Sequence, residues 1–203
     1  MKIGIVDYGM GNICSISSTL NYIGINDICI TNDFDELMTV DKIILPGVGS
    51  FANAMKNIKD KKIDIYLDEI VLKSNKPILG ICLGMQLLSK SSDEDGLTEG
   101  LGYIDAVVSR FQNLAIKIPH VGFNQVDVSE NSKLFQNIIK KPDFYFTHSY
   151  RMISEKNINQ SYCYYGESFI ASFEFNNVYG TQFHPELSQI NGIQLLTNFL
   201  NIF

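Results

Sequence analysis

One cysteine lies in a setting that suits a nucleophile. Residues 80–84 read Gly-Ile-Cys-Leu-Gly, between a short apolar run and a segment with apolar side chains at helical spacing over 83–90. Gly-x-Cys-x-Gly at a strand-to-helix turn is the cysteine form of a nucleophile elbow. Such a turn projects the Cys82 sulfur from the edge of a sheet, and the start of a helix favours its thiolate. A buried, inert cysteine fits the same pattern, so the motif alone leaves both interpretations open.

A nucleophilic cysteine needs a base, and the chain has three histidines, of which His184 has the most suitable neighbours. Pro185 restricts His184 to an extended conformation. Alternate side chains of an extended chain share a face, so we expect His184 and Glu186 to point the same way. They would supply a base and the carboxylate that orients it, which completes a Cys-His-Glu triad. A metal-binding His/Glu pair lacks a further ligand cluster, so no metal site is predicted, whereas a structural histidine at a strand end remains open.

Acyl transfer also needs donors for an oxyanion, and two turns offer them. The elbow supplies the backbone N–H of Leu83. Residues 46–50, Pro-Gly-Val-Gly-Ser, follow another apolar strand and should reach the same edge of the sheet. Their glycines would let a backbone N–H approach the substrate closely. A tight connection between a strand and a helix, without any role in chemistry, would use the same residues.

The elements that must position these groups alternate between strands and helices in the first half of the chain. Short apolar runs at 2–7, 27–31, 41–46 and 77–81 predict strands, and segments at 13–23, 33–37, 51–58 and 63–73 predict helices. This spacing indicates a mostly parallel sheet flanked by helices, an α/β fold. From residue 101 onward, strand-like runs predict additional antiparallel strands, and a last helix over 190–203 closes one domain spanning 1–203. The expected later strands are 103–108, 115–119, 122–128, 143–147, 162–165, 168–174 and 178–184.

Composition excludes several classes of function. The net charge of −6 provides no basic surface for nucleic acid. The longest uncharged stretch, 77–89, is shorter than the ~18 residues of a membrane span, and the N-terminus lacks a signal peptide. Four scattered cysteines without a C-x-x-C pair suit a reduced, cytoplasmic protein. Gly9 and Gly11 form only part of a dinucleotide-binding sequence, so no cofactor is predicted.

Several of these segments together resemble a known family. Residues 80–86 (Gly-Ile-Cys-Leu-Gly-Met-Gln) and 183–186 (Phe-His-Pro-Glu) are similar to the class I, or triad, glutamine amidotransferases, which have a flavodoxin-like core. Five further segments follow the order found in one subfamily, the glutaminase subunits of imidazole glycerol phosphate synthase. These segments are residues 7–12, 45–50, 119–124, 147–150 and 171–174. The resemblance covers nearly the whole chain.

The resemblance implies a reaction and assigns roles to residues. Cys82 would attack the side-chain amide of glutamine, His184 would move protons, and Glu186 would orient His184. Ammonia would pass to a (βα)8-barrel cyclase subunit in a heterodimer of histidine biosynthesis. The remaining implied roles are glutamine binding by Gln86, Glu94, Ser149 and Tyr150, an oxyanion turn at Val48 and Gly49, and a partner-facing side with Asn12, His120 and Asn124.

Three positions depart from the family pattern and keep other acceptors of ammonia open. The family usually has Lys at 187, Trp at 123 and Tyr at 151, whereas this chain has Leu187, Phe123 and Arg151. Close relatives that amidate a sugar in surface-glycan biosynthesis offer an alternative partner. A stand-alone cysteine hydrolase on the same fold would fit the triad but not the segments around 9–12 and 119–124. A catalytically silent binding module would have no need for all three triad residues.

Overall fold

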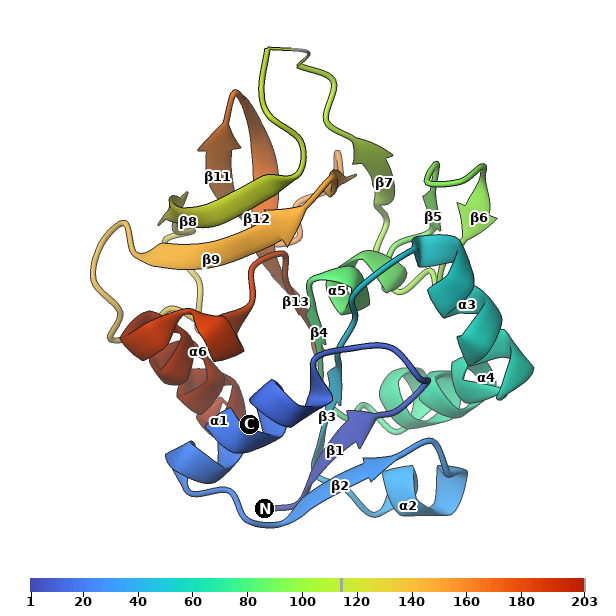
Figure 1. Ribbon diagram of the computed structural model, residues 1–203. Helices are drawn as coiled ribbons and strands as arrows, with labels where there is room; N and C mark the ends of the chain where they lie inside the picture. The colour runs from blue at the N-terminus through green and yellow to red at the C-terminus, as the bar shows by residue number, and fades with distance from the viewer. Residues whose placement is uncertain (114, 203) are drawn as a thin grey trace.

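The computed structural model describes residues 1–113 and 115–202, which form two β-sheets and two layers of helices (Figure 1). The larger sheet has nine strands in the order β2-β1-β3-β4-β13-β12-β11-β8-β9. Its first five strands are parallel, and the other four run antiparallel. The parallel strands are β1 (Ile3–Val6), β2 (Ile28–Thr31), β3 (Lys42–Leu45), β4 (Ile78–Ile81) and β13 (Val178–Thr181). The expectation of an α/β fold with a mostly parallel core and additional antiparallel strands is confirmed.

The parallel strands are buried because helices cover both faces of the sheet. All four residues of β1, β3, β4 and β13 are buried, as expected for continuous apolar runs between helical layers. On one face, α1 (Ile13–Ile23) packs beside α6 (Gln189–Asn201) (Figure 1). The other face carries α3 (Phe51–Asp60), α4 (Ile63–Leu67) with the π-helical turn η1 (Asp68–Lys73), and α5 (Leu83–Leu87). A short α2 (Phe34–Met38) joins β2 to β3.

Antiparallel strands extend the sheet beyond β13, and a smaller second sheet is mixed. The extension contains β12 (Glu167–Phe175), β11 (Ser161–Tyr165), β8 (His120–Asp127) and β9 (Asp143–His148). The second sheet has the order β10-β7-β5-β6, with β10 (Tyr150–Ile153), β7 (Val107–Arg110), β5 (Ser91–Ser92) and β6 (Thr98–Glu99). In this sheet β5 and β7 are paired in parallel. Only Ser149 separates β9 from β10, so the chain passes from one sheet to the other at this residue. Both strand ends reach the neighbourhood of Cys82.

Several predicted boundaries are wrong, and each has a local cause. Residues 115–119 form turns and bends instead of a strand. The strand predicted at 103–108 begins later, as β7 at Val107, because residues 103–105 form bends. β10 was missed because Arg151 interrupts its apolar pattern, although its side chain is buried. The closing helix ends at Asn201, and Phe203, included in the prediction, lies outside the described residues. We propose that residues 1–203 form one domain, because β13 and α6 complete the sheet and helical layer that the first strands begin.

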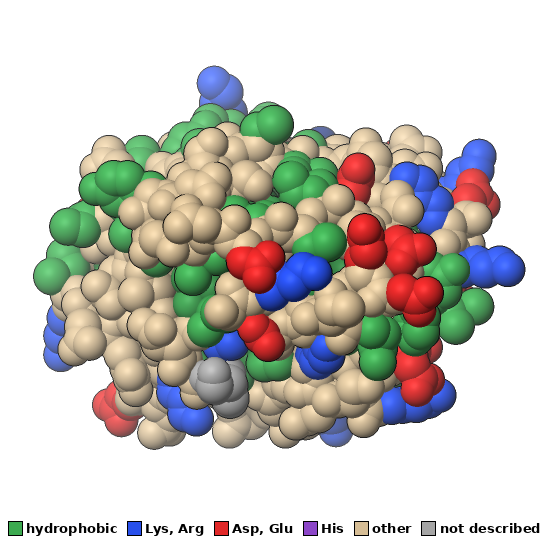
Figure 2. Space-filling model, turned by 90° about the horizontal axis from the view of Figure 1, so that it is seen from below, with side chains coloured by type: hydrophobic (Ala, Val, Ile, Leu, Met, Phe, Trp, Pro, Cys, Tyr) green, Lys and Arg blue, Asp and Glu red, His purple; other side chains and the backbone are tan. Residues whose placement is uncertain are grey.

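The outer surface carries charges of both signs. Figure 2 shows acidic and basic side chains interspersed on the face seen from below. In the part of the chain that the structure describes, none of the helices is both long and apolar enough to span a bilayer.

Candidate active site

Cys82 occupies a strained turn between β4 and α5. Its backbone has φ 54° and ψ −111°, a combination that non-glycine residues rarely adopt and that is concentrated at functional sites. The Cys82 N–H donates to Thr181 O at 2.7 Å, which ties the turn to the end of β13. The side chain is 6% exposed and lines a cavity. This is the geometry of a nucleophile elbow, as the flanking glycines predicted.

Close backbone packing explains the glycines of this turn. A Cβ at Gly84 would lie 1.8 Å from Leu45 O, and one at Gly80 would lie 2.6 Å from Gly84 O. A Cβ at Gly47 would lie 2.6 Å from Gly84 N. The elbow and the turn after β3 therefore approach one another at a distance that side chains would prevent. Glycine at these positions brings two sets of backbone N–H groups to one place.

The helix after Cys82 is shorter than predicted. α5 ends at Leu87 instead of Lys90, and all five of its residues are buried. The apolar spacing was interpreted as one face of an amphipathic helix, but the segment is a buried single turn. Its dipole is correspondingly small.

His184 and Glu186 form a buried pair. His184 Nδ1 donates to Glu186 Oε1 at 2.8 Å, and the two side chains are 3% and 0% exposed. His184 is extended as predicted, with φ −95° and ψ 97°, but Glu186 lies in the 3-10 helix η2 (Pro185–Leu187). The expectation that both residues lie on one extended strand is therefore wrong. Pro185 starts the 3-10 turn, and this turn brings the carboxylate back to the imidazole.

Backbone contacts fix the position of the pair. The His184 N–H donates to Tyr145 O at 2.9 Å, and Ser188 Oγ donates to His184 O at 2.6 Å. A Cβ at Gly192 would lie 1.8 Å from Pro185 O, so α6 packs directly on the turn. Asn12 Nδ2 donates to Glu186 Oε1 at 3.2 Å. The carboxylate oxygen that orients His184 is thus itself oriented from the start of α1.

The electrostatic environment favours a charged imidazole. Burial lowers the pKa of His184, but the Cys82 sulfur and the Glu186 carboxylate outweigh it and raise the pKa to about 10. Within the described chain, His184 Nε2 is buried and has no hydrogen bond of good geometry. The contact with Cys82 is therefore looser than a hydrogen bond, as is common in catalytic sites without substrate. A charged imidazole beside the sulfur is the arrangement of a Cys-His nucleophile pair.

The turn after β3, residues 46–50, is fixed by a buried hydrogen bond from Tyr8. The buried Tyr8 hydroxyl donates to Pro46 O at 2.8 Å, and burial raises the pKa of Tyr8, which keeps it a donor. Gly49 has φ 104°, a conformation that favours glycine. Val48 is exposed, and Ser50 caps α3 by accepting from Asn53 N. The peptide between Val48 and Gly49 consequently lies at the rim of the cavity.

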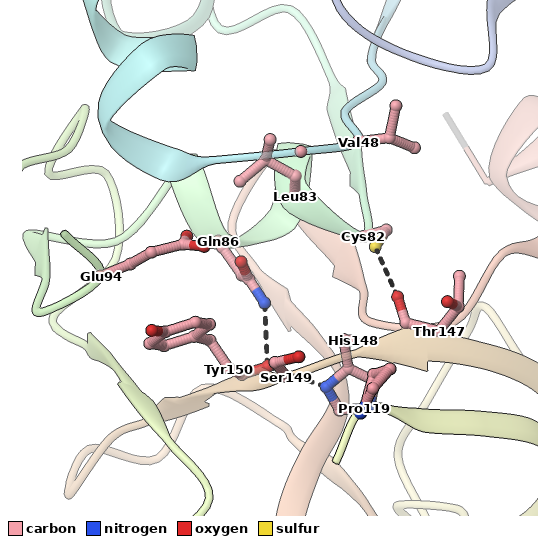
Figure 3. A pocket seen from close by; sticks show the side chains of 11 residues that line it. Val48, Cys82, Leu83, Gln86, Glu94, Pro119, Thr147, His148, Ser149 and Tyr150 are labelled. Atoms are coloured by element: carbon pink, nitrogen blue, oxygen red, sulfur yellow. Dashed lines mark hydrogen bonds between the residues drawn. The ribbon is translucent and has the colours of Figure 1, made fainter.

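A cavity of about 290 Å³ brings most of the predicted residues together, although His184 and Glu186 do not line it (Figure 3). In Figure 3, Cys82 and Glu94 lie at opposite ends of the pocket, with Gln86 and Tyr150 between them. Eight residues expected for catalysis, oxyanion stabilisation or glutamine binding line it: Val48, Gly49, Cys82, Leu83, Gln86, Glu94, Ser149 and Tyr150. Three more residues line the cavity and were not predicted, although all of them belong to segments that carried the resemblance: Pro119, Thr147 and His148.

The polar groups of the pocket have defined orientations. Gln86 Nε2 donates to Tyr150 O at 3.0 Å and to Gln182 Oε1 at 2.9 Å, so only its Oε1 is free to accept a bond from a ligand. Glu94 Oε2 accepts from Phe51 N at 3.0 Å, and burial raises the pKa of Glu94. A ligand ammonium beside Glu94 would favour its charged form. This end of the pocket is suited to a cationic group.

Two further histidines form a buried pair behind the pocket. His148 Nδ1 lies 2.8 Å from Tyr150 O, so this nitrogen carries the proton, and His148 Nε2 accepts from His120 Nδ1 at 3.1 Å. Burial lowers the pKa of His148 to about 3 and that of His120 to about 4. The His120 ring stacks on Tyr165 with centroids 4.0 Å apart. Asn124, on the same strand as His120, donates to Tyr164 O at 3.1 Å.

Among the residues that the structure describes, no group of three or more His, Cys, Asp and Glu side chains is arranged to hold a metal ion.

Comparisons with known proteins agree with this geometry. The family described as "Glutamine amidotransferase class-I" matches residues 4–202. Solved structures with the same fold include one titled "Crystal structure of glutamine amidotransferase" (TM-score 0.77, 18% identity, covering 100% of this chain and 98% of that one). Another is PurLQS from Thermotoga maritima (TM-score 0.74, 19% identity, covering 99% and 98%). The chain belongs to the class-I glutamine amidotransferase family.

Relatives with more than 40% identity indicate the subfamily to which the chain is most similar. "Imidazole glycerol phosphate synthase subunit HisH 1" of Campylobacter jejuni strain RM1221 is 42% identical over 98% of this chain and 100% of its own length. "Imidazole glycerol phosphate synthase subunit HisH 2" of Methanococcus maripaludis is 45% identical over 98% of both chains. The resemblance to this subfamily, noted from the sequence motifs, is thereby confirmed.

Proposed function

We propose that this protein is the glutaminase subunit of an imidazole glycerol phosphate synthase. The observation that carries the proposal is one cavity that holds the strained Cys82 at one end and Glu94 at the other. Similarity to HisH subunits over almost the full chain supports the same assignment.

The first half of the reaction forms a thioester and releases ammonia. The Cys82 thiolate attacks the carbon of the glutamine side-chain amide, and the carbonyl electrons move onto oxygen. The N–H of Leu83 and the turn at Val48 and Gly49 stabilise this oxyanion. The His184 imidazolium gives its Nε2 proton to the amide nitrogen, the C–N bond breaks, and ammonia leaves.

The second half hydrolyses the thioester. Neutral His184 takes a proton from water, and the resulting hydroxide attacks the thioester carbon. The C–S bond breaks, the new γ-carboxyl group loses its proton to solvent as glutamate leaves, and the thiolate and imidazolium are restored. Glu186 remains charged throughout and keeps Nδ1–H directed at itself, so Nε2 faces the reaction.

The amino-acid end of glutamine is assigned to the opposite end of the pocket. Its α-ammonium would lie between Glu94 and Gln86 Oε1, which are an anion and an acceptor. Its α-carboxylate would accept from backbone N–H groups around Ser149 and Tyr150. The chain crosses between the two sheets at these residues, so the contact depends on both β9 and β10.

Ammonia would pass to a (βα)8-barrel cyclase subunit, in a heterodimer whose contact surface includes residues near Asn12, His120 and Asn124. Asn12 provides a route from that surface to the triad, because it bonds Glu186. His120 is itself buried, so it would act through the strand β8. Leu187 and Phe123 are exposed apolar side chains that a partner would cover.

Glutamate release from glutamine tests the proposal. It is measured with the purified chain alone, and with a (βα)8-barrel cyclase subunit and its nucleotide substrate. We expect slow release alone and a large increase in the complex. Full activity without the partner would contradict the heteromeric synthase. Cys29→Ser, which changes a thiol on β2 away from the cavity, is the control and should behave as wild type.

The departures at positions 187 and 123 leave a sugar as a second candidate acceptor. Leu187 and Phe123 replace the Lys and Trp usual in the histidine-pathway subfamily, and both are exposed. Leu187→Lys tests this point through its affinity for a histidine-pathway barrel. Tighter binding would indicate that the chain has departed from that partner, and weaker binding would favour imidazole glycerol phosphate synthesis.

A further inference from the structure

Gln182 lies against the nucleophile, although no motif assigned it a role. Its side chain is fully buried two residues before His184, and its Nε2 lies 3.8 Å from Cys82 Sγ. The backbone N–H of Gln182 donates to Ala171 O at 2.8 Å, which continues the pairing of β13 with β12 beyond the strand end. The position of the amide is therefore fixed by the sheet.

The orientation of this amide follows from a single carbonyl. Tyr150 O can only accept, so the Gln86 atom that contacts it at 3.0 Å is the nitrogen. The second hydrogen of that nitrogen points to Gln182 at 2.9 Å, so the Gln182 atom there is the oxygen. The remaining Gln182 atom, the nitrogen, then faces the sulfur. Rotating either amide by 180° would place two donors or two acceptors together.

A second contact supports the role of Tyr150 O as the acceptor that orients both amides. His148 Nδ1 also donates to Tyr150 O, at 2.8 Å. Tyr150 O thus accepts two hydrogen bonds, which confirms that the Gln86 atom beside it is a donor. Gln182 is fully buried and does not line the cavity, so water does not compete for its amide.

We propose that Gln182 is a catalytic residue that stabilises the Cys82 thiolate by donating an N–H, with Gln86 setting its orientation. The proposal rests on the proposed function for its place in glutamine hydrolysis. A buried thiolate needs donors, and charge-assisted bonds stabilise it more than bonds between neutral groups. An amide serves this purpose without removing a proton, so it does not compete with His184. The bond also returns the sulfur to one position after each turnover.

The test is the pH dependence of Cys82 alkylation by iodoacetamide, followed by peptide mass spectrometry so that other thiols do not interfere. Two variants remove the donor: Gln182→Met keeps the side-chain length, and Gln182→Glu places a carboxylate oxygen beside the sulfur. We expect the midpoint of the alkylation profile to rise by about one pH unit in Gln182→Met, which is about tenfold slower alkylation below the midpoint. Gln182→Glu should raise it further, because like charges repel.

Two additional variants separate electrostatics from packing. Gln86→Met leaves Gln182 in place but removes the donor that orients it, so the midpoint should rise by less than in Gln182→Met. This variant decides the question if the Gln182 variants do not fold. Gln160→Met changes a partly exposed glutamine on the antiparallel side and should leave the midpoint unchanged.

Unchanged midpoints in the folded variants would overturn the role of Gln182, since a purely structural glutamine does not alter this profile. Alkylation does not involve glutamine, so the two proposals fail separately. A shifted midpoint without any glutamine hydrolysis would contradict the proposed function and leave Gln182 as the thiolate donor.

Discussion

Replacing Glu186 with glutamine isolates the charge of the triad carboxylate. The variant is isosteric, and its amide oxygen can still accept from His184 Nδ1 and Asn12 Nδ2, as Oε1 does now. The second oxygen, Oε2, is buried and without a partner among the described residues, so little else changes around it. The substitution therefore removes one negative charge from an otherwise retained geometry.

The magnitude follows from the burial of the pair. Both side chains are nearly inaccessible, and the contact is 2.8 Å. With the charge centres roughly 4 Å apart and an effective dielectric constant of about 20, the attraction is about 4 kcal/mol. The neutral hydrogen bond that remains returns about 1 kcal/mol. The net loss of about 3 kcal/mol corresponds to a decrease in kcat/KM for glutamine on the order of 10².

The pH profile provides a second measurement of the same charge. Glu186 helps to raise the pKa of His184 to about 10, against the effect of burial, so the imidazolium is present below that pH and is lost above it. Removing the charge lowers this pKa, and the alkaline limb of the kcat/KM profile for glutamine should move to lower pH, because the imidazolium protonates the departing ammonia. Asn12→Ala serves as the comparison, because it removes one hydrogen bond and should reduce kcat/KM by about two- to tenfold. A Glu186→Gln variant within threefold of wild type, with an unmoved alkaline limb, would refute the role of Glu186.

Three other predictions test the elbow, the substrate contact and the buried histidines. Gly84→Ala should lower the free energy of unfolding by more than about 3 kcal/mol in urea denaturation, because its Cβ meets a backbone oxygen. Gly24→Ala, where nothing lies within 4 Å but φ is 101°, should lose only about 1–2 kcal/mol, and equal losses would contradict the close approach. Glu94→Gln should raise KM for glutamine by about tenfold while kcat changes little, and an unchanged KM would remove Glu94 from the α-ammonium site. The pKa values of His120 and His148 are lowered to about 4 and 3, so their neutral forms stabilise the fold above pH 6.5. As pH falls from 6.5 toward 3, the free energy of unfolding in urea should fall by up to about 1.4 kcal/mol per pH unit for each histidine. The decrease should be smaller in His148→Gln, and an identical slope in that variant would contradict this prediction.

Part of the pocket was predictable because its residues belong to local patterns. Cys82 lies between glycines that the bend requires, and Val48 and Gly49 lie in a second glycine turn after a parallel strand. Parallel strands end at one edge of a sheet, so these turns meet without any knowledge of the long-range fold. Gln86, Glu94, Ser149 and Tyr150 were assigned through the family resemblance, and the structure places all four in the cavity wall.

Features that depend on contacts distant in sequence were not predictable. The apolar spacing after Cys82 indicated a longer helix, since sequence does not reveal that all faces of α5 are buried. The relation between His184 and Glu186 was attributed to an extended chain, whereas Pro185 begins a 3-10 turn that α6 covers. Gln182 gave no signal, because its role depends on a carbonyl 32 positions earlier in the chain, at Tyr150.

The central claim is that Cys82 releases ammonia from glutamine for a partner enzyme. The most direct test compares Cys82→Ala with wild type in the complex with the (βα)8-barrel subunit, supplying either glutamine or ammonium salt and measuring imidazole glycerol phosphate. Circular dichroism establishes that the variant is folded. We predict no product from glutamine and near-wild-type product from ammonia. Product from glutamine in the folded variant would contradict the assignment of Cys82 as the nucleophile.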